Sequence, residues 1–314
     1  MIPFRKLASA SFLVLGFLVG SAYANIEITL KNDFIEQNKD KATISVSFTV
    51  DKAHVRPNPA TKDGDLHVAG RADEVGLAIV AEIMNAGSQN AAVKAIHDAE
   101  GTGTAIPLVG VWRIWCEHGG DEQQNQEKPP TDAFDTTNPP HVFEIHPITR
   151  LNDTSIIGSL HPIAGYKPKD AEAAFLKYES LKSHITVGPT TTSLTTNMAG
   201  FNYVEFVLVP LAKDTPEDLP DGTAIFASAR TLDGDILVHK RRMIFVKDSP
   251  EEKALKKLKP KDGMHVLGIP RISLKLLSFR AAHHGENEQM LDWGLPYEIA
   301  IVGFYGTVPA DKLE

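Results

Sequence analysis

The sequence contains a single cysteine, Cys116, among 314 residues. One thiol cannot form an intramolecular disulfide, so packing must stabilise the fold. Free cysteine is among the most often buried residue types, which favours a buried, inert Cys116. The alternatives are a metal ligand, a nucleophile or a bond between chains. Trp112 and Trp115 indicate a packed environment that would raise the thiol pKa and so argue against a nucleophile.

Positive charge is also scarce, since the sequence has 32 Lys and Arg residues but 40 Asp and Glu residues, and its formal net charge is -8. Affinity for nucleic acid comes mostly from Lys and Arg, so this balance argues against a general phosphate-backbone binder. The sequence therefore predicts a small molecule or another protein as the partner.

Several motifs of common enzyme classes are missing. The sequence has no H-E-x-x-H and no C-x-x-C segment. Phosphate-binding loops, dinucleotide glycine motifs and Ser-His-Asp hydrolase signatures are absent as well. Any catalytic site must therefore be built from residues that no standard motif marks.

The N-terminus has the three parts of a secretory signal peptide. Arg5 and Lys6 are basic, Phe12 to Gly20 is apolar, and Ala22-Tyr23-Ala24 is a small-x-small cleavage site. The apolar run falls short of the roughly 20 residues that span a bilayer, and no later run is longer. We expect cleavage after residue 24, a periplasmic or secreted protein with no stable membrane anchor, and a mature charge of about -10.

Strand patterns dominate the rest of the chain. Ile44, Val46, Phe48 and Val50 alternate with small polar residues, the pattern of a half-buried strand. The sequence predicts further strands over 26–30, 66–68, 77–84, 109–116, 141–151, 203–209, 223–230, 236–246, 271–279 and 297–304. Short helices are expected over 90–100, 170–183 with Asp170 as its cap, and 250–259.

These elements predict a mainly β protein with two small domains, each barrel-like (OB-like) or sandwich-like. After the signal peptide (1–24), the first domain covers 25–165 and the second 166–314. Asp-Gly-Asp turns at 63–65 and 233–235, strands led by Gly110 and Gly268, and closing strands around Glu144 and Glu298 suggest a diverged repeat. In that alignment Ala300 stands where His146 would be.

One group of reactive residues flanks the polar segment 117–140. If the runs on either side pair as a hairpin, their ends meet at one barrel mouth, where the thiolate, imidazole and carboxylate groups suit zinc. The candidate metal ligands are Cys116, His118, His141, Glu144 and His146.

Structural roles are the alternatives for these residues. His118 before two glycines and His146 before Pro147 are also typical of loop-edge histidines bonded to backbone. Asp63-Gly64-Asp65 has the letters of a tight hairpin turn, and also those of an acidic turn that binds calcium in some barrel-fold nucleases, which would give Asp65 or His67 a role.

Four segments resemble, in order, a family of exported bacterial proteins that carry D-G-D-x-H and E-L-H-P. They are Asp63 to His67, Ala78 to Ile83, Gly110 to His118-Gly119, and Glu144-Ile145-His146-Pro147, within roughly residues 43–150. This chain departs from the pattern at Trp115-Cys116-Glu117 and in the polar insertion before His141. The resemblance implies a small β-barrel of the oligonucleotide/oligosaccharide-binding (OB) type and implies no activity.

The function predicted from these features is that of an exported, non-catalytic binding or structural module. The alternative is a metal-assisted hydrolase that uses the His118 and His146 end of the barrel. An enzyme should show titratable groups converging in a cleft, and an interaction protein should show an apolar patch.

Overall fold

The computed structural model describes residues 25–120, 124–283 and 293–313. The expected signal peptide, residues 1–24, lies outside this part. Within the described residues the chain forms three sheets and five α-helices, so the mainly β fold class is confirmed. No helix in this part of the chain is long and apolar enough to cross a membrane.

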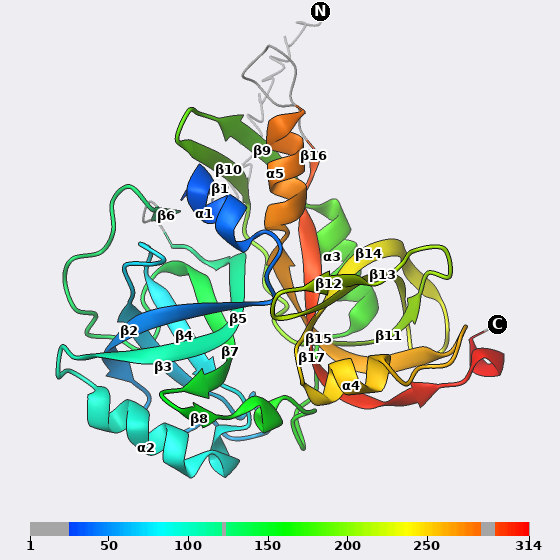
Figure 1. Cartoon of the computed structure of the whole chain (residues 1–314), viewed down its shortest axis with the longest axis horizontal. Helices are drawn as coiled ribbons and strands as arrows, with labels where there is room; N and C mark the ends of the chain where they lie inside the picture. Colours follow the sequence, from blue (N-terminus) through cyan, green and yellow to red (C-terminus); the bar gives the residue numbers. More distant parts are fainter. Residues whose placement is uncertain (1–24, 121–123, 284–292, 314) are drawn as a thin grey trace, which may run out of the picture.

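The first barrel closes on itself through five strands (Figure 1). Neighbours follow the order β4, β3, β2, β5, β7, and β7 returns to β4 through a parallel pairing. Ile44, Val46, Phe48 and Val50 are buried, as their alternation predicts. The elements are β2 (Thr43–Ala53), β3 (Leu66–Arg71), β4 (Ile79–Ile83), α2 (Asn90–Ala99), β5 (Ala105–His118), β7 (His141–Leu151) and the short β8 (Thr154–Ser155).

The second barrel repeats this topology. Its order is β11, β13, β14, β17, β15 and back to β11, again with a parallel contact between the third and fifth strands, β14 and β17. This Greek-key order is that of the OB type. The elements are β11 (Val204–Pro210), β12 (Glu217–Leu219), β13 (Gly222–Arg230), β14 (Ile236–Val246), α4 (Pro250–Leu255), β15 (Gly263–Ile272) and β17 (Tyr297–Val308).

Two glycines mark equivalent positions in the barrels. A Cβ at Gly110 would lie 2.4 Å from Ile145 Cγ2, and one at Gly268 would lie 2.5 Å from Ile299 Cγ2. Both strands therefore require glycine for the same close approach. The expected match of Asp63–Asp65 with Asp233–Asp235 is wrong, because the first turn precedes the second strand of its barrel and the second turn follows it.

A third sheet connects distant parts of the chain and stands above the barrels in Figure 1. Its strand β1 comes from the range expected for the first domain, and β1 pairs with β10 from the range expected for the second. The strand order is β16 (Trp293–Gly294), β9 (Lys182–Val187), β10 (Thr191–Asn197), β1 (Asn25–Lys31) and β6 (Gln124–Asn125). The three remaining α-helices are α1 (Asn32–Asn38), α3 (Ala171–Ser180) and α5 (Leu274–Ala282).

The strand predicted over 271–279 is wrong. Residues Leu274–Ala282 form helix α5, which Ser273 caps by accepting a hydrogen bond from the Leu276 amide. Leu274 and Leu277, three positions apart, are its buried residues. Helical spacing and a cap thus outweigh the strand-like composition. The cap predicted at Asp170 is confirmed, since its Oδ1 accepts from the Ala173 amide.

The barrels pack against each other through their outer faces. One apolar cluster joins Met84, which follows β4, to Tyr203 and to Leu267 on β15. A second joins Val111 on β5 to Ile244 and Ala300 of the second barrel. Outward-facing residues of the first barrel are therefore buried as deeply as its interior.

Candidate metal centre

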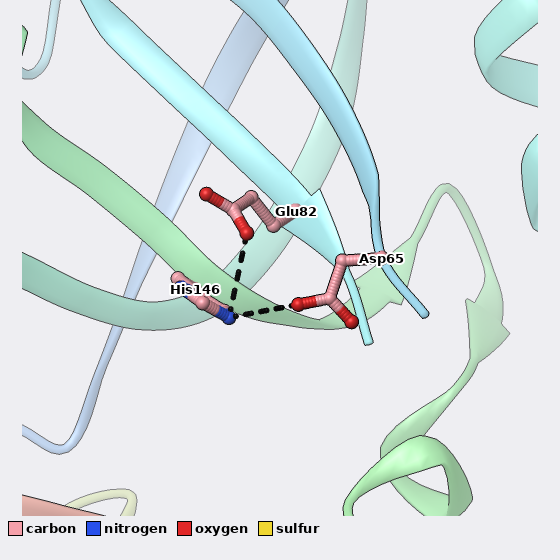
Figure 2. Close-up of side chains that lie close together, drawn as sticks. All are labelled: Asp65, Glu82 and His146. Atoms are coloured by element: carbon pink, nitrogen blue, oxygen red, sulfur yellow. Dashed lines mark ion pairs between the residues drawn. The ribbon is translucent and has the colours of Figure 1, made fainter. Parts of the chain in front are cut away.

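Three side chains from three segments of the first barrel meet at this interface (Figure 2). Asp65 directly precedes β3, Glu82 lies on β4 and His146 on β7. The pairing of Leu66 with Ile83 brings Asp65 beside Glu82, and the pairing of Ala81 with Ile145 brings Glu82 beside His146. Sheet register therefore creates the cluster.

The cluster is compact and buried. His146 Nε2 lies 3.3 Å from Asp65 Oδ2 and 3.5 Å from Glu82 Oε2. Asp65 and His146 are 0% exposed and Glu82 is 4% exposed. Oδ1 of Asp65 and Oε2 of Glu82 have no hydrogen-bond partner within the described residues. Unsatisfied buried carboxylate oxygens are costly, so the cluster needs positive charge beside them, which either a protonated imidazole or a metal ion supplies.

Burial and neighbouring charge shift the pKa values in this cluster. Burial raises the pKa of Asp65 and of Glu82. Burial alone would lower the pKa of His146, but the charge of Glu82 and its contacts with Asp65 raise that pKa well above its usual value. The cluster therefore binds a proton tightly, and a metal ion would have to replace that proton.

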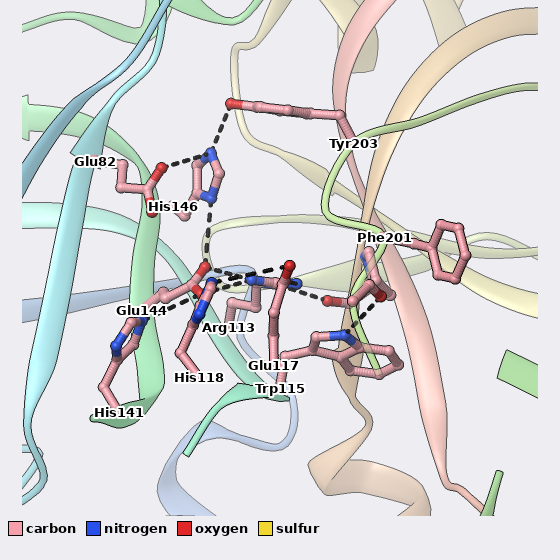
Figure 3. A network of polar contacts seen from close by, with 12 residues as sticks. Glu82, Arg113, Trp115, Glu117, His118, His141, Glu144, His146, Phe201 and Tyr203 are labelled. Carbon is pink, nitrogen blue, oxygen red and sulfur yellow. Dashed lines mark hydrogen bonds and ion pairs between the residues drawn. The ribbon is translucent and has the colours of Figure 1, made fainter. Parts of the chain in front are cut away.

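Glu144 orients the imidazole of His146 from the opposite side (Figure 3). Its Oε2 lies 3.4 Å from His146 Nδ1, while Nη1 of Arg113 lies 2.6 Å from both carboxylate oxygens. Burial would raise the pKa of Glu144, but Arg113 holds it well below its usual value. An ionised carboxylate on Nδ1 directs Nε2 towards Asp65 and Glu82.

Tyr203 completes the cluster. Its hydroxyl donates to Asp65 Oδ2 at 2.7 Å and lies 2.6 Å from His146 Nε2. Because the hydroxyl proton goes to Asp65, the Nε2 proton of His146 is donated to the Tyr203 oxygen. The network thus contains a complete hydrogen-bond path between an imidazolium and a carboxylate.

His67 lies next to the three residues and is half-buried. Its Nε2 is 3.5 Å from Glu82 Oε2 and has no hydrogen-bond partner within the described residues. Burial would lower the pKa of His67, but Glu82 and Asp63 raise it to about 9. His67 could therefore serve as a further nitrogen ligand only where a metal ion displaces its proton.

The predicted ligands are brought together only in part. The rings of His118 and His141 stack with centroids 5.1 Å apart, and His141 Nε2 lies 3.5 Å from Glu144 Oε1. These three residues form a chain of contacts that leads to His146. Cys116 instead belongs to the hydrophobic core and is 0% exposed, and burial raises its thiol pKa to about 12. Its expected buried position is confirmed.

Glu82 is the residue that the sequence analysis did not single out. It is the one charged residue in the apolar run Leu77 to Met84. A single carboxylate in an otherwise apolar strand is unusual, and this feature of the sequence could have indicated a functional role for Glu82. Asp65 and His67 were considered for a role beside their turn, and both lie in or beside the cluster.

A search of protein-family models finds no match for this chain, and a search of curated proteins finds none either. The chemistry of these side chains is therefore the basis for assigning a role.

Proposed function

We propose that the chain is an exported, non-catalytic binding or structural module in which Asp65, Glu82 and His146 bind one divalent metal ion, best matched by zinc. The ion would link three strands of the first barrel at its interface with the second.

The spacing of the donor atoms carries this proposal. Zinc binds nitrogen and oxygen at roughly 2.0–2.2 Å, which puts two tetrahedral ligands roughly 3.3–3.6 Å apart. The separations of His146 Nε2 from Asp65 and Glu82 oxygens are 3.3 Å and 3.5 Å. The carboxylate of Glu144 on Nδ1 matches the carboxylate–histidine pair behind most metal-binding imidazoles.

The donor set favours zinc over calcium or magnesium. Calcium and magnesium prefer shells made of oxygen, whereas imidazole suits zinc. His67 is the natural fourth ligand, because its Nε2 lies 3.5 Å from the same Glu82 oxygen. Metal binding needs the lone pair of His146 Nε2, so it would break the hydrogen bond to Tyr203.

Burial supports a structural rather than a catalytic ion. A hydrolytic metal keeps an open coordination position that substrate and water can reach. Asp65 and His146 have no exposed surface, and Tyr203, which covers them, is also 0% exposed. The metal-assisted hydrolase is therefore the weaker alternative.

Metal analysis of the purified mature protein tests the proposal. After chelation and dialysis, titration with Zn²⁺ should give one ion per chain, with weaker binding of Ca²⁺ and Mg²⁺. His146→Ala and the near-isosteric Glu82→Gln should abolish stoichiometric binding. His184→Ala, at an exposed histidine of β9, is the matched control and should bind normally.

Circular dichroism should report the wild-type β spectrum for each variant. A wild-type protein that binds no Zn²⁺, or a folded Glu82→Gln variant that still binds one ion, would overturn the proposal.

A further inference from the structure

A groove of about 840 Å³ lies on the second barrel and shares no residue with the metal cluster. We propose that it binds an amphipathic organic anion, a linear alkyl chain that ends in a carboxylate. This ligand class is independent of the metal proposed for the first barrel.

The walls of the groove are apolar. Ile225 and Phe226 of β13 line it, together with Leu255 and Leu258 from the end of α4 and the turn that follows. Phe226 is 37% exposed, and both leucines are only partly buried. Apolar side chains left accessible in a concave surface are typical of a ligand site, and the volume lies within the roughly 300–1,000 Å³ of small-molecule sites.

Lysines supply the charge that selects an anion. Lys259 and Lys261 line the groove and are exposed, and neither has an ion pair among the described residues. Lys259 directly follows Leu258 and Lys261 lies two residues further on, so positive charge adjoins the apolar wall. An alkyl chain can cover that wall while its carboxylate reaches an ammonium group.

The acidic residues of the lining are mostly engaged elsewhere. Asp214 pairs with Lys240 at 3.0 Å, and Asp262 accepts the Ala310 amide at 3.1 Å. Asp218 is exposed and has no ion pair within the described residues, and an amide hydrogen bond leaves the charge of Asp262 in place. Against these two carboxylates stand three lining cations that have no ion pair in the same part of the chain, Lys259, Lys261 and Arg230. Lys240, the partner of Asp214, lies over the Phe226 ring with Nζ 4.4 Å from its centre, and this ion pair adds no net charge to the groove.

Titration calorimetry with dodecanoate, below its micelle concentration, tests the site on the purified mature protein. The wild type should bind one dodecanoate saturably. The Lys259→Glu/Lys261→Glu double variant should bind it roughly ten-fold more weakly, because two attractive charges become repulsive. Lys257→Glu is the matched control, since this exposed neighbour does not line the groove and should leave the affinity unchanged.

A second variant and a second probe separate the apolar wall from the charge. Phe226→Asp should abolish dodecanoate binding while this exposed position leaves the fold intact by circular dichroism. The uncharged dodecanol should bind the wild type and the double lysine variant equally. Absence of saturable dodecanoate binding to the wild type, or unchanged affinity in both the Phe226 and the lysine variants, would overturn the proposal.

Discussion

Arg113 and Arg271 occupy equivalent positions in the two barrels, and each donates a hydrogen bond to the backbone carbonyl that precedes the other. Arg113 Nε lies 3.0 Å from Pro270 O, and Arg271 Nη1 lies 3.1 Å from Trp112 O. Both guanidinium groups are almost fully buried. The barrels are therefore related by a local two-fold arrangement at their interface.

Each arginine also pairs with a carboxylate of its own barrel. Arg113 binds Glu144, and Arg271 binds Glu298 at 2.8 Å. The barrels differ in what lies beside this carboxylate. In the first barrel Glu144 contacts His146, whereas in the second barrel the position equivalent to His146 is occupied by Ala300. The same ion pair thus supports a polar cluster in the first barrel and apolar packing in the second.

Replacing Arg113 by Met should destabilise the protein and weaken zinc binding. The change leaves Glu144 buried without its cation, which costs about 3–5 kcal/mol. It also removes the largest influence that lowers the pKa of Glu144, so the ionised carboxylate that orients His146 would be held less firmly. Urea unfolding and Zn²⁺ titration measure the two effects.

Arg271→Met is the control for this change. It should cost a smaller free energy of unfolding, because Glu298 keeps its ion pair with Arg242 and its hydrogen bond from Ser273, and it should leave zinc affinity unchanged. Equal loss of zinc affinity in both variants would mean that the Arg113 effect reflects general damage to the interface.

Much of the fold follows from local sequence, whereas the third sheet does not. The alternation from Ile44 to Val50 is visible in neighbouring residues and predicts β2. Strand β1 instead pairs with β10, and Thr29 and Ser193 hydrogen-bond across 164 positions. The alternation of Ile26, Ile28 and Leu30 predicts the strand itself, but nothing in either segment identifies the other as its partner.

The metal cluster was predictable only in part, for a related reason. His146 and Glu144 could be placed on one strand face from period two alone. The partner of His146 depends on which strand closes the barrel, and here β4 rather than the neighbouring hairpin strand supplies Glu82. Cys116 has the parity of Trp112 and Ile114, so it faces the core instead.

Replacing Tyr203 by Phe should have opposite effects on the metal-free and the zinc-bound protein. Without metal, Asp65 loses a hydrogen-bond donor at a buried site, which should cost about 1–3 kcal/mol. Zinc binding should be retained or strengthened, because the hydroxyl no longer competes for His146 Nε2. Thermal unfolding with and without Zn²⁺ measures both, and loss of zinc binding would show that Tyr203 is itself a ligand.

Cys116 should be unreactive in the folded protein. Burial removes the thiol from solvent and raises its pKa to about 12, so almost no thiolate is present at pH 8. A thiol reagent should modify it only after unfolding in urea. Cys116→Ala should keep one zinc per chain, and loss of the metal in that variant would restore Cys116 as a ligand.

Replacing Glu251 by Gln should stabilise the protein at pH 8 and have little effect at pH 4.5. Glu251 is 0% exposed, and within the described residues neither carboxylate oxygen has a hydrogen-bond partner. Burial raises its pKa to about 7 from an ordinary value of 4.5. The folded state therefore binds the proton more tightly, and stability falls as pH rises between these two values. Above pH 7 the full penalty remains, about 3 kcal/mol for a shift of this size.

Glu252→Gln is the matched control, because replacing this adjacent carboxylate should change the free energy of unfolding in the opposite direction. Burial would raise the pKa of Glu252, but Lys256 and the Asp248 amide lower it overall. Its ionised form stabilises the fold above the unfolded pKa, and that contribution is lost as pH falls through the folded pKa. Urea unfolding at pH 4.5, 6 and 8 should thus show a gain for Glu251→Gln that grows with pH and a loss for Glu252→Gln that grows with pH. A pH-independent difference for Glu251→Gln would mean that the side chain ionises normally and is reached by solvent.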